Sequence, residues 1–387
     1  MLPIALKSFH IKNYRGIIDT QIDNIPDDTQ WIFLTGENGF GKTSVLQALA
    51  LGFTQKIDLE EEQENEATVL FSFKKNNEII PEFSQEDIND ENYFDYYSEM
   101  YGGIVMGLID YTIGYGSTRL RISAGTSTEV TKKYDSTSSL FSNDTLLINI
   151  EERFKDWSIN YAEGKAKLAK IFRELLPRLG TIQVSFDDKI KTTIVKYFEK
   201  DEEGNQYPEG LTFDQLAAGY RNIIGMIGDM IFRLSLEQDV EDYKDLEGIV
   251  LIDEFELHLH PKYQKLFVEK LTELFPKIQF IVSTHSPIPL LGAPKNSVII
   301  NVSRSKEEGI KAELLDIDFS VLTPNTILSS PIFGFQDLIP ESKSNDEIVR
   351  TEDTYKEVLF HDQLDKQIDD FLTEENKQEL LDLLKVK

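Results

Sequence analysis

The feature that most constrains the fold is a glycine-rich segment between an apolar run and a segment with helical spacing. Residues 31–35 read Trp-Ile-Phe-Leu-Thr, residues 36–43 read Gly-Glu-Asn-Gly-Phe-Gly-Lys-Thr, and apolar residues then recur at helical intervals up to Phe53. The octapeptide satisfies the pattern G-x-x-x-x-G-K-[ST] completely, and strand, loop and helix are the context in which it forms a phosphate-binding P-loop. We therefore predict an α/β fold of the P-loop NTPase type.

The predicted P-loop gives its residues separate tasks in binding ATP and Mg²⁺. Gly36 and Gly41 let the backbone turn tightly around phosphate oxygens, and the next helix points its N-terminal N–H groups at them. Lys42 is expected to contact the β- and γ-phosphates, and the Thr43 hydroxyl to ligate Mg²⁺. A chance match on a structural turn is the alternative, which the flanking strand and helix disfavour. The residues of this segment predicted to bind nucleotide are Gly36, Asn38, Gly39, Gly41, Lys42, Thr43 and Ser44.

A second apolar run, residues 248–252, leads directly into the acidic pair Asp253 and Glu254. A buried strand that ends in an acid is the Walker B pattern, which is weak alone but strong when a P-loop lies upstream. We expect Asp253 to hold Mg²⁺, through water, and Glu254 to orient and polarise the attacking water. Neighbouring side chains on a strand point to opposite faces, which allows the two carboxylates different roles.

A third apolar run, residues 278–283, is followed by Thr-His-Ser-Pro at 284–287. The carboxyl ends of strands in an α/β sheet form its ligand-binding edge, so we expect His285 to reach the γ-phosphate. A histidine in an ordinary surface loop is the alternative. Helical spacing over 217–234 and 261–275 alternates with the apolar strands, which predicts a mostly parallel sheet flanked by helices.

The order of these motifs resembles a known class of ATPases. Residues 211–221, Leu-Thr-Phe-Asp-Gln-Leu-Ala-Ala-Gly-Tyr-Arg, precede the acidic pair. The chain resembles the ABC-type ATPases of the SMC, RecF, RecN and OLD class in the order of its motifs. That order is a P-loop, then L-x-x-G-x-R, then a strand that ends in Asp-Glu, and then a strand followed by Thr-His-Ser-Pro. Residues 13–16, Asn-Tyr-Arg-Gly, resemble the N-F-R-G start of that class, and residues 255–261 resemble its E-x-H-L-H-P run.

Within that class the chain most resembles compact ATP-binding proteins of bacterial defence loci, the ATPase subunits of Septu-type systems and of retrons. Residues 215–222 and 114–119 are similar to variants found in this subgroup. The resemblance covers about residues 1–55 and 205–300 well, and it is weak in the middle of the chain and in its tail.

The resemblance implies an ATPase that dimerises head-to-tail around ATP, as a homodimer or a higher even-numbered oligomer. Arg15 then approaches the nucleotide, and the P-loop of one subunit faces a signature segment of the other. The class carries a serine where this chain has Ala217, and a hydroxyl hydrogen bond to an anion contributes about 1.5–3 kcal/mol. Slow hydrolysis is therefore expected. The residues of the signature segment are Leu216, Ala217, Ala218, Gly219 and Arg221.

The two halves of the predicted site flank a long central region. We expect residues 1–55 and 206–335 to form the ATPase domain, with residues 56–205 inserted as a lid or arm subdomain. Residues 336–387 carry apolar residues at helical spacing among many charges, which predicts a helical tail that could bind a partner.

Composition narrows the partners and the location. The net charge is −28, and the chain contains no cysteine, which excludes disulfides and thiolate metal sites. Nucleic-acid binders present cationic surfaces, so a nucleic-acid partner is possible but not favoured, with the basic stretch 160–178 as its best candidate. No apolar run approaches the length of a membrane span, and the N-terminus does not read as a secretory signal, so we expect a cytoplasmic protein without membrane contact.

Three functions remain open. The preferred one is an ATPase whose nucleotide state regulates a separate effector nuclease in antiviral defence. A RecF-like DNA-repair ATPase that acts on DNA directly is the first alternative, and a scaffold with structural ATP is the second. His258 and His260 lie near acidic residues and would also allow zinc, but the E-x-H-L-H-P resemblance accounts for both histidines without a metal.

Overall fold

The structure is a computed structural model that describes residues 2–54, 68–75, 78–83, 110–118, 136–189, 191–315 and 333. The chain divides into two compact units, and all of these residues belong to the first, Met1–Gly334. The predicted helical tail over 336–387 lies outside the described residues, and so does Arg119 of the segment 114–119.

A ten-stranded mixed sheet forms the centre of this unit. Its parallel part comprises, in spatial order, β6 (Thr112–Tyr115), β9 (Gly248–Ile252), β10 (Ile278–Ser283), β3 (Trp31–Thr35) and β11 (Val298–Ser305). Its antiparallel part continues with β12 (Gly309–Leu315), β2 (Ile17–Ile22), β1 (Ile4–Tyr14), β4 (Thr68–Lys75) and β5 (Glu78–Phe83). The predicted α/β fold of P-loop type is confirmed, although the sheet is mixed.

The helices pack on both faces of the sheet. They are α1 (Lys42–Thr54), α6 (Ile150–Asn160), α7 (Ala162–Leu175), α8 (Ala218–Glu237) and α9 (Pro261–Leu274). Short 3₁₀ turns lie at Ser138–Leu140, Phe213–Gln215, Tyr243–Asp245 and Pro289–Gly292. No helix among the described residues is both long and apolar enough to cross a lipid bilayer.

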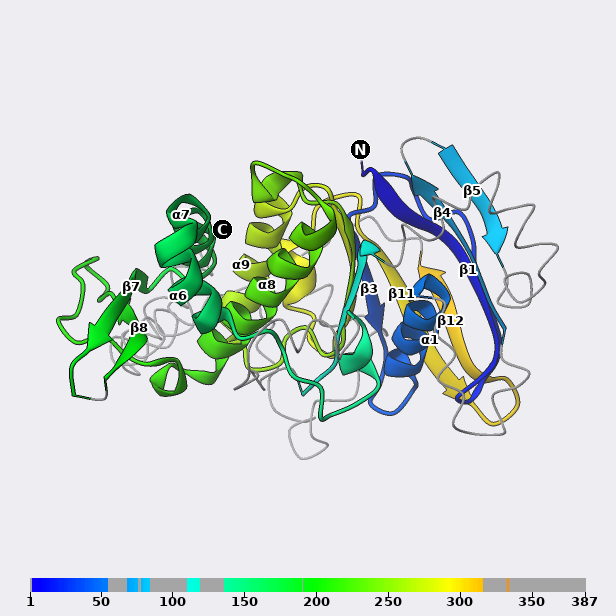
Figure 1. Ribbon diagram of the computed structural model, residues 1–387. Helices are drawn as coiled ribbons and strands as arrows, with labels where there is room; N and C mark the ends of the chain where they lie inside the picture. Colours follow the sequence, from blue (N-terminus) through cyan, green and yellow to red (C-terminus); the bar gives the residue numbers. More distant parts are fainter. Residues whose placement is uncertain are drawn as a thin grey trace, which may run out of the picture. The chain divides into compact units, whose positions relative to one another are not determined.

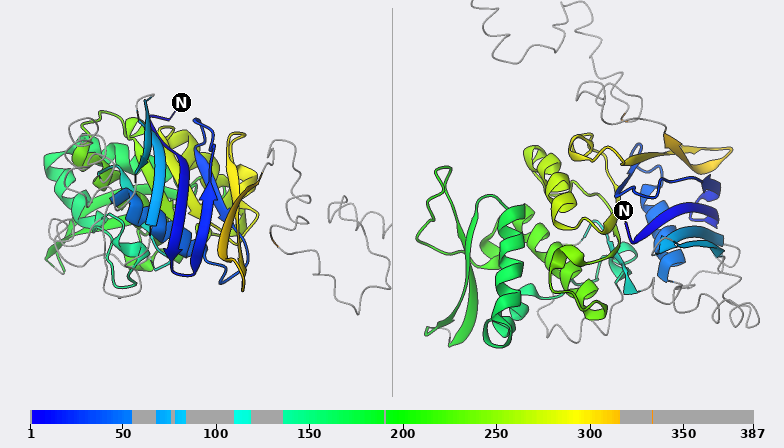
Figure 2. Two further views of the ribbon diagram at one scale, coloured as in Figure 1. Left: turned by 90° about the vertical axis from the view of Figure 1, so that its right-hand side faces the viewer. Right: turned by 90° about the horizontal axis from the view of Figure 1, so that it is seen from above.

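Alternation along the parallel strands separates two cores. Ile32 and Leu34 of β3 pack in one buried cluster with α1, whereas Trp31 and Phe33 pack in another that includes α8 and α9. Successive side chains of a strand point to opposite faces, so α1 covers one face of the sheet and α8 and α9 cover the other (Figures 1 and 2). Continuous apolar runs are therefore what these doubly covered strands require.

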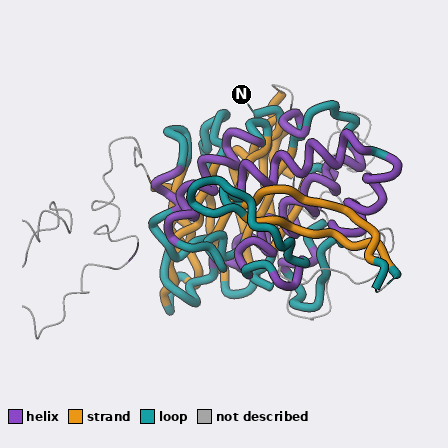
Figure 3. Tube along the Cα trace, turned by 90° about the vertical axis from the view of Figure 1, so that its left-hand side faces the viewer, coloured by secondary structure: helices purple, strands orange, loops and turns teal. Residues whose placement is uncertain are grey.

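A second, two-stranded sheet lies beyond α8 and α9 (Figures 1 and 3). Its strands are β7 (Leu179–Asp187) and β8 (Thr192–Glu199), and they share a buried core with α6, α7 and α8. Within the range 56–205, β4, β5 and β6 instead join the large sheet. The proposed boundaries of an inserted lid or arm stay a prediction.

Candidate nucleotide-binding site

The glycine-rich loop between β3 and α1 has the backbone that its sequence requires. Gly36, Gly39 and Gly41 have φ values of 135°, 80° and 97°, a backbone conformation that residues other than glycine rarely adopt. A Cβ at Gly36 would overlap the carbonyl oxygen of Val302, and one at Gly41 would overlap the side chain of Ile310. Gly39 has open space around its Cα. The loop thus forms an open cradle that only glycines allow, which is the form that a phosphate site needs.

Lys42 is buried beneath this loop. Its Nζ donates to the carbonyl oxygens of Gly36 at 2.8 Å and Glu37 at 2.9 Å, and it lies 3.1 Å from Nδ1 of His285. Burial lowers the pKa of Lys42 to about 8, against the opposing effect of Asp253, Glu256 and Glu254. The amine therefore remains largely charged at neutral pH, and it can exchange two carbonyl oxygens for phosphate oxygens.

His285 is held in one protonation state. Burial and the charge of Lys42 lower its pKa, so the ring is neutral at physiological pH. Because the ammonium of Lys42 donates, Nδ1 accepts and the ring proton lies on Nε2. The backbone N–H of His285 donates to Oε1 of Glu256 at 2.7 Å, which fixes the loop after β10. The ring therefore carries one N–H that can donate to a phosphate oxygen.

Thr43 and Asp253 form the pair that fits a magnesium ion. Thr43 is exposed at the start of α1, and its Oγ1 donates to Oδ2 of Asp253 at 2.9 Å. Ser283 Oγ donates to Oδ1 of the same carboxylate at 2.5 Å. Mg²⁺ prefers such hard oxygen ligands and usually completes its shell with water and phosphate oxygens. The donor set therefore fits Mg²⁺ bound together with a nucleotide.

Glu254 lies beyond the end of β9 and in the left-handed region, with φ of 47°. Its N–H donates to Ser283 Oγ at 2.8 Å, and its charge acts on both Lys42 and His285. Contrary to the prediction from the sequence, strand alternation does not set the directions of Asp253 and Glu254, because β9 ends at Ile252. The turn, and not the pleat, separates the two carboxylates while keeping both near Lys42.

Arg15 reaches the site region through a tight hairpin turn. Tyr14 pairs with Ile17, and the two residues between them, Arg15 and Gly16, have φ of 42° and 90°, as a two-residue turn of type I′ requires. Nη1 of Arg15 donates to Oε1 of Gln47 at 2.7 Å, and Nε2 of Gln47 donates to the carbonyl of Leu140 at 2.6 Å. Arg15 is therefore attached to α1, the helix that follows the P-loop.

The signature segment lies at the start of α8. Ala217 is the N-cap residue, it is exposed, and no side chain caps the helix there. A Cβ at Gly219 would come 2.6 Å from the carbonyl oxygen of His258, and Asn222 donates to the carbonyl of Leu257 at 3.1 Å. This segment therefore packs on the turn after the acidic pair, while α8 and α1 cover opposite faces of the sheet.

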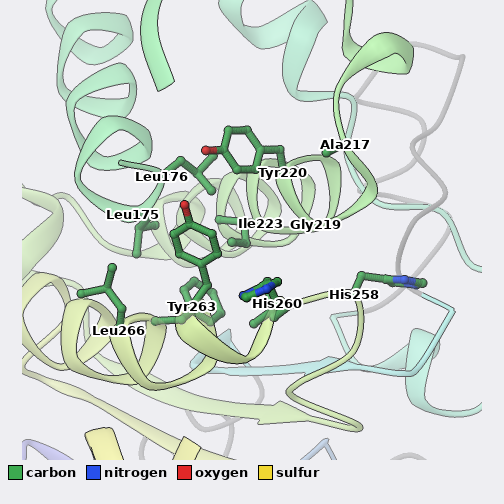
Figure 4. A pocket seen from close by; sticks show the side chains of 12 residues that line it. Leu175, Leu176, Ala217, Gly219, Tyr220, Ile223, His258, His260, Tyr263 and Leu266 are labelled. Carbon is green, nitrogen blue, oxygen red and sulfur yellow. The ribbon is translucent and has the colours of Figure 1, made fainter. Parts of the chain in front are cut away.

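An apolar pocket of about 160 Å³ adjoins the signature segment (Figure 4). It lies between the end of α7 and the starts of α8 and α9, and its lining includes Ala217, Gly219, Tyr220 and Tyr263. His260 caps α9 through Nδ1, which accepts the N–H of Lys262 at 3.2 Å. No cluster of three or more His, Cys, Asp or Glu side chains suited to a metal occurs in the described part of the chain.

The predicted residues fall into two groups. Lys42, Thr43, Asp253, Glu254 and His285 come together at the carboxyl ends of β3, β9 and β10, and the signature segment lies apart from them at the start of α8. Of the other predicted P-loop residues, Asn38 and Gly39 are exposed in the loop and Ser44 lies in the first turn of α1. Of the other predicted signature residues, Leu216 is buried, and Nε of Arg221 is buried without a hydrogen-bond partner in the described residues.

Sequence reasoning did not assign roles to three residues at this site. Ser283 joins Asp253 to Glu254, Glu256 holds the backbone of His285, and Gln47 joins Arg15 to Leu140. Ser283 and Glu256 lie within motifs that the sequence did reveal, so their position was a usable signal. Gln47 lies inside a helix with no motif to single it out.

Comparison with known proteins identifies the family. The profile of the AAA ATPase domain matches residues 5–158 and 128–288. The chain belongs to this family. It is 27% identical over 351 residues to the Septu protein PtuA of Bacillus mycoides (strain KBAB4), covering 87% of this chain and 46% of that protein.

A second relative is the retron Vc95 probable ATPase of Vibrio cholerae serotype O1 biovar El Tor. It is 40% identical over 117 residues, which cover 29% of this chain and 20% of that protein. The chain thus spans less than half the length of either of these relatives. Among solved structures, the SMC head domain from Thermotoga maritima matches with a TM-score of 0.44 and 15% identity, over 81% of this chain and 99% of that one.

Proposed function

We propose that this AAA ATPase binds ATP·Mg²⁺ at the P-loop, hydrolyses it slowly within a head-to-tail homodimer, and thereby regulates a separate effector nuclease in antiviral defence. The observation that carries the nucleotide site is the cluster formed by Lys42, Thr43, Asp253 and His285. These residues come from three distant parts of the chain, and Lys42 lies within hydrogen-bonding distance of His285 as the adjacent Thr43 does of Asp253.

The geometry supports a simple division of labour during hydrolysis. Backbone N–H groups of the loop Gly36–Gly41 and the start of α1 bind the phosphate oxygens, and Lys42 Nζ moves from the loop carbonyls to the β- and γ-phosphates. Thr43 and Asp253 would hold Mg²⁺, which when bound would neutralise charge on the phosphates. Glu254 accepts the proton of the attacking water, a role that contributes about 10²–10⁴-fold in rate. His285 donates its Nε2–H to the γ-phosphate.

The placement of the two helices supports a dimer. The P-loop leads into α1 on one face of the sheet, and the signature segment leads into α8 on the other. The signature segment and the P-loop of one subunit thus belong to helices on opposite faces of the sheet, which favours a signature segment supplied by another subunit. In a two-fold dimer each segment faces the P-loop of the other subunit, and two equivalent sites form together.

The proposal of a separate effector rests on similarity and charge. The relatives include a Septu protein and a retron ATPase. Three cations of the basic stretch 160–178 pair with acids: Lys167 with Glu163 at 2.8 Å, Lys170 with Glu174 at 3.8 Å and Arg178 with Glu202 at 2.8 Å. Together with the net charge of −28, these acidic neighbours weaken the attraction of the stretch for phosphates. A protein effector is therefore favoured over direct action on DNA.

Two substitutions test the nucleotide site and the dimer. Lys42→Ala should abolish the heat of ATP·Mg²⁺ binding in calorimetric titration, because the charge-assisted contact to phosphate is lost. Glu254→Gln should bind ATP but turn it over at least about a hundredfold more slowly, and light scattering should then show an accumulated dimer. Lys265→Ala, at an exposed lysine of α9, is the matched control and should behave as the unmodified protein.

The outcomes separate the parts of the proposal. Wild-type affinity in Lys42→Ala would refute the P-loop assignment, and normal turnover in Glu254→Gln would refute the role of that carboxylate. ATP binding without turnover or dimerisation would support the scaffold alternative. The effector proposal is tested with the purified product of the neighbouring gene: its nuclease activity must change with ATP concentration when this protein, but not Lys42→Ala, is added.

A further inference from the structure

The segment Gly114–Gly116 ends β6 and is fixed on both sides by the turn at 137–140. Cβ atoms at Gly114 and Gly116 would overlap Leu140 and the carbonyl of Ser139. Oγ of Ser139 donates to the carbonyl of Gly114 at 2.7 Å and accepts the N–H of Gly116 at 3.2 Å. Both glycines are therefore required for this close approach, and the backbone of Tyr115 between them has little freedom.

Tyr115 is attached to the Mg²⁺ aspartate through its backbone. β6 runs parallel to β9, with Tyr115 beside Ile252. The carbonyl oxygen of Tyr115 accepts the N–H of Asp253 at 2.8 Å. A shift of the Asp253 backbone when Mg²⁺ and phosphate bind would therefore displace Tyr115 or break this hydrogen bond.

The side chain of Tyr115 is attached to the signature helix. Its ring is buried in the core that contains α8, and its hydroxyl donates to Oδ2 of Asp229, in the middle of α8, at 2.8 Å. Burial raises the pKa of Tyr115 well above its usual value, so the hydroxyl keeps its proton and remains a donor. One residue thus contacts both Asp253 and α8.

The carboxylate of Asp229 is the fixed end of this connection. It is 1% exposed, it accepts the N–H of Ile148 at 2.9 Å, and it pairs with Nε of Arg233 at 2.9 Å. A buried carboxylate with several donors holds a fixed orientation, because each lost donor would leave a charge without compensation. A shift of the Tyr115 hydroxyl is therefore transmitted to α8 and is not absorbed by rotation of Asp229.

We propose that Tyr115 is a positioning residue that couples the ATP·Mg²⁺ site at Asp253 to α8, so that nucleotide binding changes the exposure or orientation of the signature segment. The inference rests on the proposed nucleotide site, and it adds the route by which one site communicates with the dimer surface. The signature segment at the start of α8 is about three helical turns from Asp229, along the same helix. The competing explanation is that this network only stabilises the core.

The test uses two tyrosines that differ in their hydrogen bonds. Tyr115→Phe removes only the hydroxyl that contacts Asp229. Tyr197→Phe is the matched control, because Tyr197 is also fully buried but its hydroxyl has no hydrogen-bond partner within the described residues. For each protein, calorimetry measures the affinity for a non-hydrolysable ATP analogue with Mg²⁺. Deuterium exchange then measures protection of Ala218–Glu237 with and without the analogue.

We expect the analogue to change exchange at the start of α8 by about five- to tenfold in the unmodified protein and in Tyr197→Phe, a normal size for coupling between sites. Tyr115→Phe should bind with an affinity within about threefold of the unmodified protein, yet show little change at α8. ATP-dependent dimerisation, measured by light scattering, should weaken in parallel. A purely structural role would not separate these readouts, since it would lower thermal stability and affect binding and exchange together.

Three results would overturn the coupling: an unchanged response of α8 in Tyr115→Phe, no response of α8 in the unmodified protein, or a loss of affinity in proportion to the loss of response. The proposed dimer can fail separately. If α8 responds through Tyr115 while light scattering shows only monomers, the coupling stands and the dimer does not. If the unmodified protein binds no nucleotide, both fall.

Discussion

Ser283 forms hydrogen bonds to two residues of the proposed phosphate site at once. Its Oγ donates to the Asp253 carboxylate and accepts the N–H of Glu254, and it is fully buried at the end of β10. Asp253 is then oriented by Ser283 through one oxygen and by Thr43 through the other. A hydrogen bond to a charged group contributes about 1.5–3 kcal/mol, so this serine fixes the carboxylate before any ligand binds.

Ser283→Ala should therefore lower ATP turnover by about ten- to a hundredfold, the rate equivalent of one such hydrogen bond. Affinity for ATP without Mg²⁺ should change little, because Lys42 and the loop are untouched. Steady-state phosphate release over a range of Mg²⁺ concentrations is the measurement. Ser286→Ala is the control, since Oγ of Ser286 contacts Gln264 and not Asp253. Equal turnover in the two variants would contradict the positioning role of Ser283.

The sequence predicted residues whose roles follow from position in a short motif. Lys42 and Thr43 are consecutive, and the helix start after the loop dictates where both must point. Contacts between distant segments, such as Gln47 with Leu140 or Tyr115 with Asp229, could not be predicted from the sequence. Those depend on which elements become neighbours in the fold, and a polar residue inside a helix or strand gives no local sign of its partner.

At the scale of elements, the doubly buried strands were the easiest to predict. β3, β9 and β10 are continuous apolar runs because helices cover both of their faces, and each lies within a residue of its predicted bounds. Their spatial order does not follow from periodicity. The antiparallel strands β4, β5 and β12 carry charges and polar residues at short intervals, as edge and half-exposed strands do, and went unrecognised.

Helix α6 begins with a carboxylate that its surroundings disfavour. Asn149 caps the helix by accepting the N–H groups of Glu151 and Glu152. Burial raises the pKa of Glu151 from 4.5 to about 7; nearby Asp214 acts in the same direction and Lys155 opposes it. The positive end of α6 favours the charged form by about 0.3–1 kcal/mol, which is smaller than the shift that burial produces.

The sign of the resulting pH effect is set by proton uptake. Between pH 4.5 and about 7 the folded state holds the Glu151 proton and the unfolded state does not, so the free energy of unfolding falls as pH rises. The full shift corresponds to about 3 kcal/mol, and partial exposure reduces it to about 1–2 kcal/mol. Glu151→Gln should therefore stabilise the protein by that amount at pH 8 and have no effect at pH 4.

Thermal or urea unfolding at the two pH values measures this difference. Glu152→Gln is the control from the same helical turn, because Glu152 is 46% exposed and pairs with Lys155 at the surface. It should change stability by less than about 0.5 kcal/mol at either pH. If Glu151→Gln stabilises the protein equally at pH 4 and pH 8, the pKa of Glu151 is not raised in the folded state.

At the scale of the whole molecule, the sheet lies between the helices that carry the two halves of the proposed ATPase site. The proposed phosphate site lies at the start of α1, and the proposed trans segment starts α8 on the opposite face. In the proposed dimer a second copy would complete the site, and two-fold symmetry would complete two sites at once. The single chain cannot reveal this contact, but Ala217 allows a test of it, because that residue is both the N-cap of α8 and the position that would face the partner's γ-phosphate.

Replacing Ala217 separates these two roles. Serine and aspartate both cap helices well, so Ala217→Ser and Ala217→Asp should each stabilise the protein by about 1 kcal/mol, seen as a higher melting temperature. Serine also offers a hydroxyl to the partner's phosphate, which should raise turnover about tenfold or somewhat more. Aspartate instead places a negative charge there and should weaken ATP-dependent dimerisation and turnover. Phosphate release over a range of protein concentrations decides between the readings: if both variants melt higher and neither alters turnover, the segment caps α8 but meets no phosphate.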